Sequence, residues 1–344
     1  MMRKKDRKIR DIILCLNDLS KRISEGEMNG ERLKYLVIGA GGTGGAIGSH
    51  MAQAGHDVTF IARGSHLAAM RENGLKVSRP DGEFVIDPVS AYTVDEYTEL
   101  CGKPDVIFVC VKGYSIDDTI PFISTIAGTD TIVIPILNIF GTGSQMQKRL
   151  PGITVTDGCI YVASEITEPG HILMKGTILR VVFGLRKDQK QFSDKLMPLL
   201  ERVRDDMCSS RIEGILSDNI ERDTLRKFSY ISPQGACGLY YGVPVGAVQK
   251  PGEIRDCFTG LIREISDLAD AMGIGFGEDI VPVNLDITAG LSPDMTTSLQ
   301  RDVAAGKDSE IDGLIYEVVR MGEKYGVSTP LYTKISAELR KKLQ

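Results

Sequence analysis

Residues 34–63 read K-Y-L-V-I-G-A-G-G-T-G-G-A-I-G-S-H-M-A-Q-A-G-H-D-V-T-F-I-A-R. A short apolar run at residues 35–38 leads into a glycine-rich turn, and a β-rich run at residues 57–62 follows one helix length later. Strand, glycine turn, helix and strand, in this order, form the context that the G-x-G-x-x-G pattern needs before it indicates a dinucleotide site. The stretch therefore predicts a dinucleotide-binding βαβ unit, and an ordinary βαβ turn is the alternative.

Each glycine of the pattern has its own physical role. Gly39 permits the tight turn after the strand, Gly41 lets the backbone approach a pyrophosphate, and Gly44 lets the helix pack close to the sheet. The phosphates are expected to bind the free N–H groups of a helix that begins near Thr43. The predicted cofactor-binding residues of this turn are Gly39, Ala40, Gly41, Gly42, Thr43 and Gly44.

The end of the second strand bears on the choice of dinucleotide. Sites for NAD usually carry Asp or Glu there to bind the ribose 2′-hydroxyl, whereas an arginine suits the 2′-phosphate of NADP. This chain has Arg63, followed by Gly64, Ser65 and His66. A guanidinium binds phosphate through paired, charge-assisted hydrogen bonds. We therefore expect NADP(H) as the cofactor, and a solvated surface arginine is the alternative interpretation of Arg63.

The composition is typical of a globular protein and excludes several functional classes. At 344 residues, 42% of them hydrophobic and 25% charged, the chain is long enough for two domains with separate cores. A formal net charge of -5 argues against nucleic acid as a partner, and no apolar run is long enough for stable membrane insertion. The seven cysteines include no C-x-x-C pair, so we expect reduced thiols and a cytoplasmic location. The four histidines form no cluster with metal-ligand spacing, so no metal is expected.

The first 33 residues differ from the rest of the chain. Basic residues crowd positions 3–10, and isoleucines and leucines then recur at helical spacing up to residue 23. We predict a basic amphipathic extension that contacts a membrane surface or a partner. The alternatives are an appended helix without such a contact, or an upstream start before Met28. No small-residue cleavage site follows the extension, so it is not predicted as a signal peptide.

Two later apolar runs predict parallel strands of the same sheet. Residues 104–111 and 131–137 are almost continuously apolar, as expected for strands that are buried on both faces. Lys112 follows the first run and Asn138 follows the second. Ligands of an open α/β sheet bind outside the carboxyl ends of its strands, so Lys112, Asn138 and Arg63 are expected to converge on the glycine turn. Exposed loop residues are the alternative for each of them.

The remaining pattern divides the chain into a sheet part and a helical part. Helical periodicity runs from about residue 188 to the end. We predict an α/β fold, with a Rossmann-type doubly wound sheet domain at residues 34–205 and an all-helical C-terminal domain at residues 206–344. A boundary anywhere between about residues 185 and 215 fits the pattern. Other strand-like stretches are residues 75–77, 84–87, 154–166 and 177–183.

The helical part offers one candidate for acid–base chemistry. A nicotinamide supplies hydride to a ketone, but the developing alkoxide also requires a proton donor. Lys227 lies in the sequence L-R-K-F, among apolar residues that could lower its pKa, and its ammonium could also attract a carboxylate substrate. Ser298 and Glu310 offer a hydroxyl and a carboxylate further on, and ordinary helix-surface residues are the alternative for both.

Taken together, these motifs resemble the ketopantoate reductase (2-dehydropantoate 2-reductase) family, as a divergent member, from about residue 34 to the C-terminus. The resemblance implies that NADPH reduces the ketone of 2-dehydropantoate to give pantoate for pantothenate and coenzyme A synthesis. The matching stretches are G-A-G-G-T-G at 39–44, I-A-R-G-S-H-L at 61–67, V-K at 111–112, Asn138 with Gly141, R-K-F at 226–228, and S-L-Q-R-D through E-I-D at 298–312.

The resemblance also implies roles for residues of the first domain. In that family the glycine turn and the strand-end arginine hold NADPH, which implies this role for residues 39–44 and Arg63. Residues that match Lys112, Asn138 and Ala163 line the cofactor near the nicotinamide, and Asn138 also faces the substrate.

For the second domain, the resemblance implies that Lys227 is the proton donor and contacts the substrate. Ser298 and Glu310 would close the site from this domain, Ser298 toward the substrate and Glu310 toward the cofactor. The implied partner is a small-molecule 2-oxo acid, and a homodimer is compatible with the sequence.

Four positions depart from the family's usual pattern. Family members usually carry asparagines where this chain has Ile231, Gly235 and Val245, and a glycine where Ile139 follows Asn138. Apolar replacements would leave the hydroxyls of a polar substrate unpaired, at a cost of about 1–3 kcal/mol for each buried group. Two alternatives therefore stay open, a reductase of a different, more apolar 2-oxo acid and a non-catalytic NADP(H)-binding regulatory protein. Other donors that could replace the asparagines are Ser229, Tyr230, Ser232 and Gln234.

Overall fold

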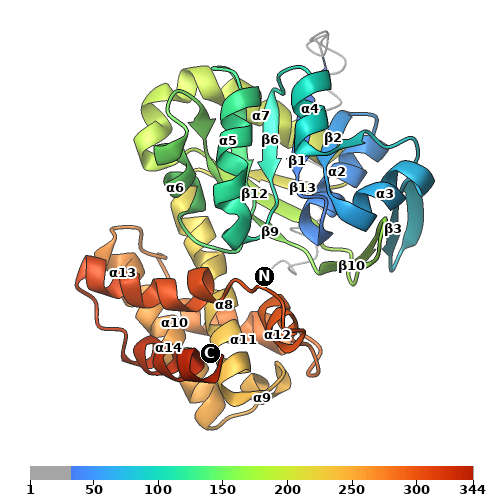
Figure 1. The fold of residues 1–344 in the computed structure, drawn as a ribbon. Helices are drawn as coiled ribbons and strands as arrows, with labels where there is room; N and C mark the ends of the chain where they lie inside the picture. The colour runs from blue at the N-terminus through green and yellow to red at the C-terminus, as the bar shows by residue number, and fades with distance from the viewer. Residues whose placement is uncertain (1–31, 344) are drawn as a thin grey trace, which may run out of the picture.

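Six parallel strands form the central sheet of the first domain (Figure 1). The computed structural model describes residues 32–343, and the extension predicted for residues 1–33 lies almost entirely outside the described residues. Numbered along the chain, the six strands follow the 3-2-1-4-5-6 order of a Rossmann fold, which confirms the predicted fold class. In spatial order they are β5 (Ala91–Tyr92), β2 (Asp57–Ile61), β1 (Lys34–Ile38), β6 (Val106–Val109), β7 (Ile132–Pro135) and β8 (Thr154–Val155).

Helices cover both faces of this sheet. They are α2 (Gly42–Gln53), α3 (Gly64–Asn73), α4 (Val94–Leu100), α5 (Ile116–Ile126), α6 (Thr142–Arg149) and α7 (Ser193–Ser209). Because strand side chains alternate between the two faces, Val37 and Phe108 pack in one core with α2, α3 and α7, whereas Leu36 and Ile107 pack in another with α4, α5 and α6. All residues of β6 and β7 are buried, which confirms the prediction of strands covered on both faces.

Two smaller sheets complete the domain. One has the order β10 (Ser164–Glu168), β11 (His171–Met174), β3 (Leu75–Arg79) and β4 (Gly82–Ile86), and the other β13 (Glu213–Leu216), β12 (Arg180–Gly184) and β9 (Asp157–Tyr161). The strands predicted near residues 75 and 84 form the antiparallel hairpin β3–β4. The sequence did not predict β11, and the helical pattern expected after residue 188 is wrong at β13, which pairs in parallel with β12. Whether a segment of four residues forms a strand is decided by the strands that pair with it rather than by its own hydrophobic pattern.

The C-terminal half is helical and packs around one apolar core that includes Phe228, Phe258 and Tyr332. Its helices are α8 (Ile220–Tyr241), α9 (Gly246–Gln249), α10 (Glu253–Ala271), α11 (Ile280–Ala289), α12 (Ser298–Ala304), α13 (Glu317–Tyr325) and α14 (Pro330–Lys342), with a π-helical turn η3 (Asp312–Tyr316) before α13. Helix α7 continues past residue 205, and β13 still belongs to the sheet domain. We therefore propose that the domain boundary lies at residues 217–219, between β13 and α8.

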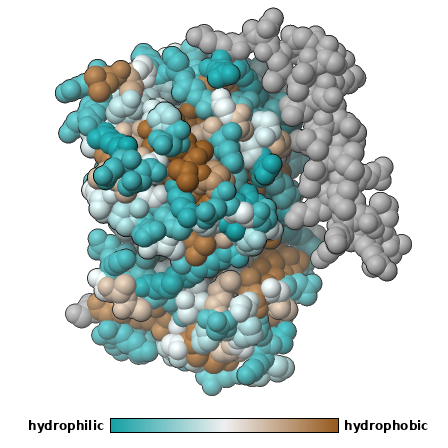
Figure 2. Space-filling view, turned by 90° about the vertical axis from the view of Figure 1, so that its right-hand side faces the viewer, coloured by the Kyte–Doolittle hydropathy of each residue, from teal (hydrophilic) through white to brown (hydrophobic). Residues whose placement is uncertain are grey.

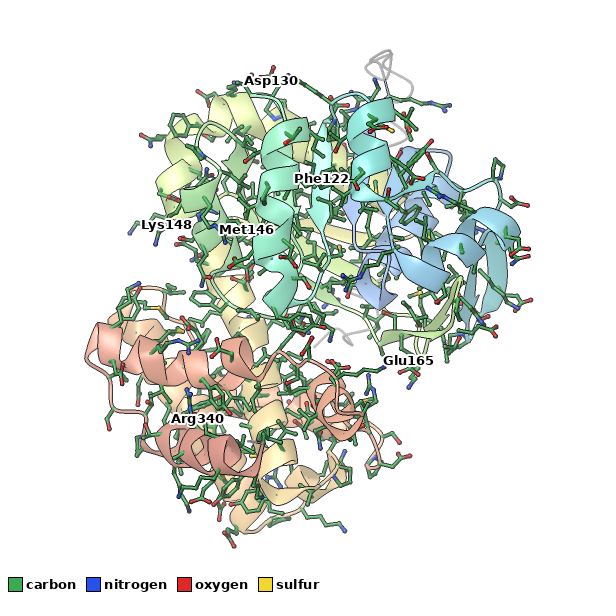
Figure 3. The ribbon with its side chains drawn as sticks, viewed as in Figure 1. Phe122, Asp130, Met146, Lys148, Glu165 and Arg340 are labelled. Atoms are coloured by element: carbon green, nitrogen blue, oxygen red, sulfur yellow. The ribbon has the colours of Figure 1, made fainter. Side chains whose placement is uncertain are left out.

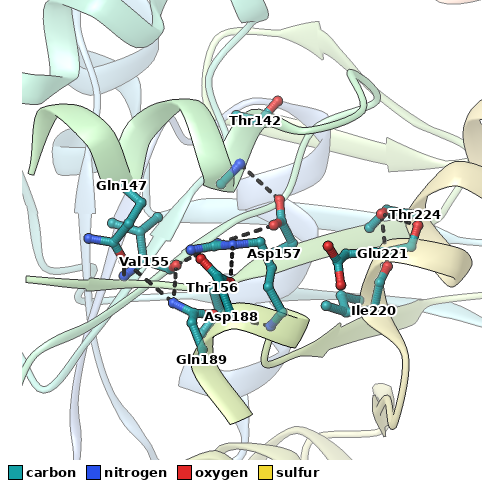
Figure 4. A network of polar contacts seen from close by, with 12 residues as sticks. Thr142, Gln147, Val155, Thr156, Asp157, Asp188, Gln189, Ile220, Glu221 and Thr224 are labelled. Atoms are coloured by element: carbon teal, nitrogen blue, oxygen red, sulfur yellow. Dashed lines mark hydrogen bonds and ion pairs between the residues drawn. The ribbon is translucent and has the colours of Figure 1, made fainter. Parts of the chain in front are cut away.

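Helix α8 connects the two domains (Figure 1). Its first turns lie beside β9, and its later turns lie in the helical core. A buried polar network anchors the start of β9 (Figure 4): the backbone N–H of Gly143 donates to Asp157 at 2.8 Å, and Arg186 binds both Asp157 and the carbonyl of Val155. This network fixes the strand against which α8 packs.

Polar and apolar side chains are mixed over the face of the molecule in Figure 2, with apolar residues gathered in small separate areas. None of the helices in residues 32–343 combines the length and the apolar character that a bilayer crossing requires.

Candidate active site

The glycine turn after β1 has the geometry that the pattern predicts. Gly39 has a φ of +96°, and its N–H donates to the carbonyl of Ile61 at 3.1 Å, which joins the turn to β2. A Cβ at Gly44 would lie 2.1 Å from the carbonyl oxygen of Gly39, so α2 can approach the sheet only with glycine there. A Cβ at Gly41 would have nothing within 4 Å among the described residues. The turn is therefore crowded toward the protein and open toward a ligand at Gly41.

The N-terminus of α2 fits a pyrophosphate. The helix starts at Gly42, and its N-cap residue Gly41 offers no side chain to bind the first N–H groups. The first turn contains no acidic residue that would repel an anion. Free N–H groups and the positive end of the helix dipole favour bound phosphate. Ala163 is exposed just before β10, and the next residue, Ser164, lies close enough to Gly42 that a Cβ there would be 2.8 Å from the Ser164 carbonyl oxygen.

Arg63 lies at the exposed carboxyl end of β2, as the N-cap of α3. Within residues 32–343 its guanidinium forms no hydrogen bond or ion pair, so it is available to a ligand. The neighbouring His66 joins the turn to the β10–β11 hairpin: the backbone N–H of Gly170 donates to Nδ1 at 3.0 Å, and Nε2 lies 2.9 Å from the carbonyl oxygen of Ala40. Because Nδ1 accepts a hydrogen bond and Nε2 faces a carbonyl oxygen, the imidazole ring is neutral with its proton on Nε2. Burial lowers the pKa of His66, which also favours the neutral form.

Lys112 follows β6 and forms ion pairs with the helical domain. Its Nζ lies 2.8 Å from Asp302 and 3.4 Å from Glu310, and the backbone N–H of Gly113 donates to the other oxygen of Glu310 at 3.0 Å. Burial alone would lower the pKa of Lys112, but the carboxylates of Glu310 and Asp302 outweigh it and raise the pKa. Glu310 is only 6% exposed. A further contact joins Arg301 to Glu165, 3.7 Å apart, where Glu165 faces the helical domain (Figure 3).

Lys227 and Asn138 meet across the domain interface. Lys227 lies in the first turns of α8, and Asn138 follows β7. The ammonium of Lys227 donates to Oδ1 of Asn138 at 2.6 Å, although the two residues come from different domains. Lys227 is 6% exposed, and burial lowers its pKa, partly offset by Cys159 and Glu310. A buried ammonium whose pKa is lowered releases its proton more readily than the ammonium of an exposed lysine.

Two of the four polar residues named as alternative donors, Ser229 and Ser232, are occupied by other partners, whereas the buried hydroxyl of Tyr230 has no hydrogen-bond partner among the described residues. Ser229 donates to the carbonyl of Arg226, and Ser232 lies within hydrogen-bond distance of the Leu314 carbonyl and of Tyr332. Residues four and eight positions after Lys227 share its helix face, and these are Ile231 and Gly235. A Cβ at Gly235 would lie 3.1 Å from Leu299 of α12. The helix face beyond the ammonium is therefore apolar and lies against α12.

Helix α12 presents Ser298 and Asp302. A capping box between Thr297 and Gln300 fixes its first turn. Ser298 is half-buried at the start of the helix, and Asp302, one turn later, binds Lys112. The sequence missed Asp302, although its spacing of four from Ser298 could have signalled a shared helix face.

Ile139, which stands where the family usually has glycine, packs between the two domains. A Cβ at Gly113 would lie 2.1 Å from Cδ1 of Ile139, and a Cβ at Gly313 would lie 2.4 Å from it. The next residue, Phe140, packs against Phe228 of α8, with ring centres 6.3 Å apart. The side chain of Ile139 therefore fits at this position because both of its neighbours, Gly113 and Gly313, lack a side chain.

Comparison with protein families gives two matches. Residues 35–188 match the model described as "Ketopantoate reductase PanE/ApbA", and residues 219–343 match the model described as "Ketopantoate reductase PanE/ApbA C terminal". The two models cover most of the chain.

Individual relatives are distant but cover nearly the whole molecule. The chain is 23% identical over 310 residues to the "Uncharacterized oxidoreductase YkpB" of Bacillus subtilis, covering 90% of this chain and 98% of that protein. It is 26% identical over 314 residues to the 2-dehydropantoate 2-reductase of Aquifex aeolicus, covering 87% and 93%. Among solved structures, a D-mandelate dehydrogenase with NADH and anilino(oxo)acetate shares the fold, with a TM-score of 0.78, 20% identity, and 90% and 98% of the two chains covered.

Proposed function

The chain belongs to the ketopantoate reductase PanE/ApbA family, and we propose that it reduces the ketone of 2-dehydropantoate to the alcohol of pantoate with NADPH. Members of this family are NAD(P)-dependent oxidoreductases that act on CH–OH groups, and this chain is one of them. The observation that carries the proposal is the 2.6 Å hydrogen bond between Lys227 and Asn138. It supports a proton donor opposite the carboxyl edge of the sheet, where a Rossmann fold binds its ligand.

The residues around the glycine turn would hold the cofactor. The free N–H groups of α2 and the open space at Gly41 suit the pyrophosphate. The guanidinium of Arg63, which has no ion pair among residues 32–343, suits the 2′-phosphate. Lys112, Ala163 and Glu310 would border the nicotinamide end. When bound, NADPH supplies the hydride that reduces the carbonyl carbon.

Lys227 would donate the proton that the reduced oxygen requires. Asn138 holds the ammonium in place, and the burial that lowers the pKa of Lys227 makes proton release easier. The same positive charge attracts the carboxylate of a 2-oxo acid, and Ser298 would donate to the substrate from α12. The described cysteines are free thiols, which supports a reducing, cytoplasmic setting for the reaction.

A second candidate substrate is a 2-oxo acid with an apolar side chain. The observation that favours it is the apolar face of α8 beyond Lys227, formed by Ile231 and Gly235 against Leu299. A helix face without amides does not compensate the desolvation of a substrate hydroxyl that lies against it. The mandelate dehydrogenase neighbour, solved with anilino(oxo)acetate, supports an aryl side chain as one group to test.

A substrate panel tests both candidates. Purified protein is assayed for oxidation of NADPH with 2-dehydropantoate and with branched and aryl 2-oxo acids, and kcat/KM values are compared. We expect turnover with 2-dehydropantoate, and higher values with an apolar acid would favour the second candidate. Lys227→Ala should lower kcat by about 10²–10⁴-fold, whereas the Kd of NADPH should change by no more than about twofold. Lys195→Ala, an exposed lysine on α7, is the matched control.

Two outcomes would contradict the proposal. Turnover by the Lys227→Ala variant at the wild-type rate would remove Lys227 as the donor. Tight NADPH binding without oxidation of any oxo acid would favour the non-catalytic regulatory protein.

A further inference from the structure

The ring of Tyr161 lies beside the ammonium of Lys227. The Nζ atom of Lys227 is 5.7 Å from the ring centre, within the range of a cation–π contact. Tyr161 is the last residue of β9, which lies beside the segment that follows β7 and leads to Asn138. It packs with Cys159 and Ile220 at the start of α8. The lysine therefore has the amide oxygen of Asn138 and an aromatic ring as neighbours from the sheet domain.

The position of this ring is well defined. Asp157, on the same face of β9 four residues earlier, is held by Gly143 and Arg186 in the buried network of Figure 4. Arg180 of the adjacent strand β12 is paired with Tyr161 in the sheet, and its guanidinium lies 5.9 Å from the ring centre. Arg180 is itself held by Glu213, 2.9 Å away.

The ammonium of Lys227 has few other sources of stabilisation. An ammonium that is 6% exposed loses most of its hydration, and Asn138 accepts only one of its three protons. Burial raises the pKa of Cys159 to about 11, so this thiol is neutral at physiological pH. Glu310 is shared with Lys112 and Gly113. The titratable and charged groups around Lys227 are Asp223 and Arg226 on its own helix, Cys159 and Tyr161 on β9, Arg180 on β12, and Glu310 with Lys112.

We propose that Tyr161 is a positioning residue for Lys227, and that the face of its ring keeps the buried side chain cationic and directed at Asn138. Burial raises the pKa of the Tyr161 hydroxyl, so the ring stays neutral and does not compete as an acid. The inference rests on the proposed function, because it assigns Tyr161 a role in the proton transfer by Lys227.

The test compares three substitutions by two measurements. Tyr161→Leu and Tyr161→Met remove the aromatic ring and keep an apolar side chain, whereas Tyr161→Phe keeps the ring. The first measurement is the pH dependence of kcat, whose alkaline limb reports deprotonation of the acid. The second follows the side-chain carbon resonance of Lys227 in the cofactor-free protein as pH is raised, and Lys227→Arg identifies the resonance.

We expect the leucine and methionine variants to move both midpoints to lower pH by about one pH unit, because the ring no longer stabilises the charged form. Tyr161→Phe should keep the wild-type midpoints, and so should Tyr97→Leu, which removes a buried tyrosine of α4 far from Lys227. Unchanged midpoints in the leucine and methionine variants would overturn the inference. An equal shift in Tyr161→Phe would also overturn it, because the hydroxyl would then be responsible.

The two measurements keep this inference separate from the proposed function. The resonance titration requires neither cofactor nor substrate, so it decides on Tyr161 even if no oxo acid is turned over. Suppose that Lys227→Ala turns over substrate at the wild-type rate, while Tyr161→Leu shifts the Lys227 resonance. This combination would contradict the proposed function but not the role of Tyr161.

Discussion

At the scale of single residues, Arg63 is the residue to which we assign the preference for NADPH in the proposed function. Its guanidinium is exposed and, within residues 32–343, unpaired, and no acidic residue occupies positions 62–69. We predict that Arg63→Ala raises the KM for NADPH by about 10- to 100-fold, because a charge-assisted hydrogen bond to phosphate contributes about 1.5–3 kcal/mol. The KM for NADH should hardly change. Steady-state kinetics with both cofactors measures this, and Arg149→Ala, on the far side of the sheet domain, is the control.

If Arg63→Ala raised the KM for NADPH and for NADH equally, the arginine would stabilise the fold of the turn rather than bind the 2′-phosphate. An unchanged KM for NADPH would assign Arg63 to the solvated surface.

The sequence was enough to name candidate site residues, which stay predictions, but it could not give their contacts. The glycine turn, Arg63 and Lys112 each end a strand of one parallel sheet, and sheet topology alone brings such residues to one edge. The bond between Lys227 and Asn138 depends on how two domains meet, which no local pattern encodes. The sequence did not mark Tyr161 as a candidate site residue, because aromatic residues in strands usually pack in the core.

At the scale of elements, the packing of α2 against β1 distinguishes Gly44, which is crowded by the sheet, from Gly41, which is open and which we propose contacts the cofactor. We predict that Gly44→Ala lowers the free energy of unfolding by about 1–3 kcal/mol, because its Cβ would lie 2.1 Å from the backbone oxygen of Gly39. Gly41→Ala should leave stability almost unchanged, since its Cβ meets nothing within 4 Å and its φ of -73° suits alanine. It should weaken NADPH binding, because the methyl group occupies the space proposed for the pyrophosphate.

Chemical denaturation and NADPH titration of the two variants test this pair. If Gly41→Ala bound NADPH as tightly as the wild type, the pyrophosphate would have to lie elsewhere.

Elements with strong patterns were predicted, and short elements were not. The buried runs that became β6 and β7 are apolar throughout, and the β3–β4 hairpin has a turn of proline, aspartate and glycine. By contrast, β13 reads E-G-I-L and follows a long helix, so only its pairing with β12 makes it a strand. Two-residue strands such as β5 depend in the same way on the edge of a sheet that already exists.

At the scale of the whole molecule, buried histidines make stability depend on pH. Burial, with a smaller contribution from Arg79, lowers the pKa of His50 from 6.5 to about 4, although a bond to the Ala46 carbonyl opposes the shift. The unfolded chain therefore binds more protons than the folded one between these values. The contribution of neutral His50 to the free energy of unfolding is fully present above about pH 6.5, and it is lost as pH falls toward 4. His66 acts in the same direction.

We predict that the difference in free energy of unfolding between the wild type and His50→Gln shrinks by about 2 kcal/mol from about pH 7 to about pH 5. Glutamine can keep one bond to Ala46 and one to Arg79 but does not titrate. Urea denaturation at the two pH values measures the difference. Identical pH dependence in both proteins would show that His50 is not responsible.

Helix α8 carries Lys227 seven residues after its first residue, while the start of the helix is fixed beside β9. Adding or deleting one residue within that interval would rotate the ammonium by about 100° around the helix axis. The length of this interval therefore determines the direction in which the side chain of Lys227 points. On the proposal that Lys227 is the proton donor, the seven-residue spacing between the first residue of α8 and Lys227 cannot change, whereas the side chains that contact the substrate can.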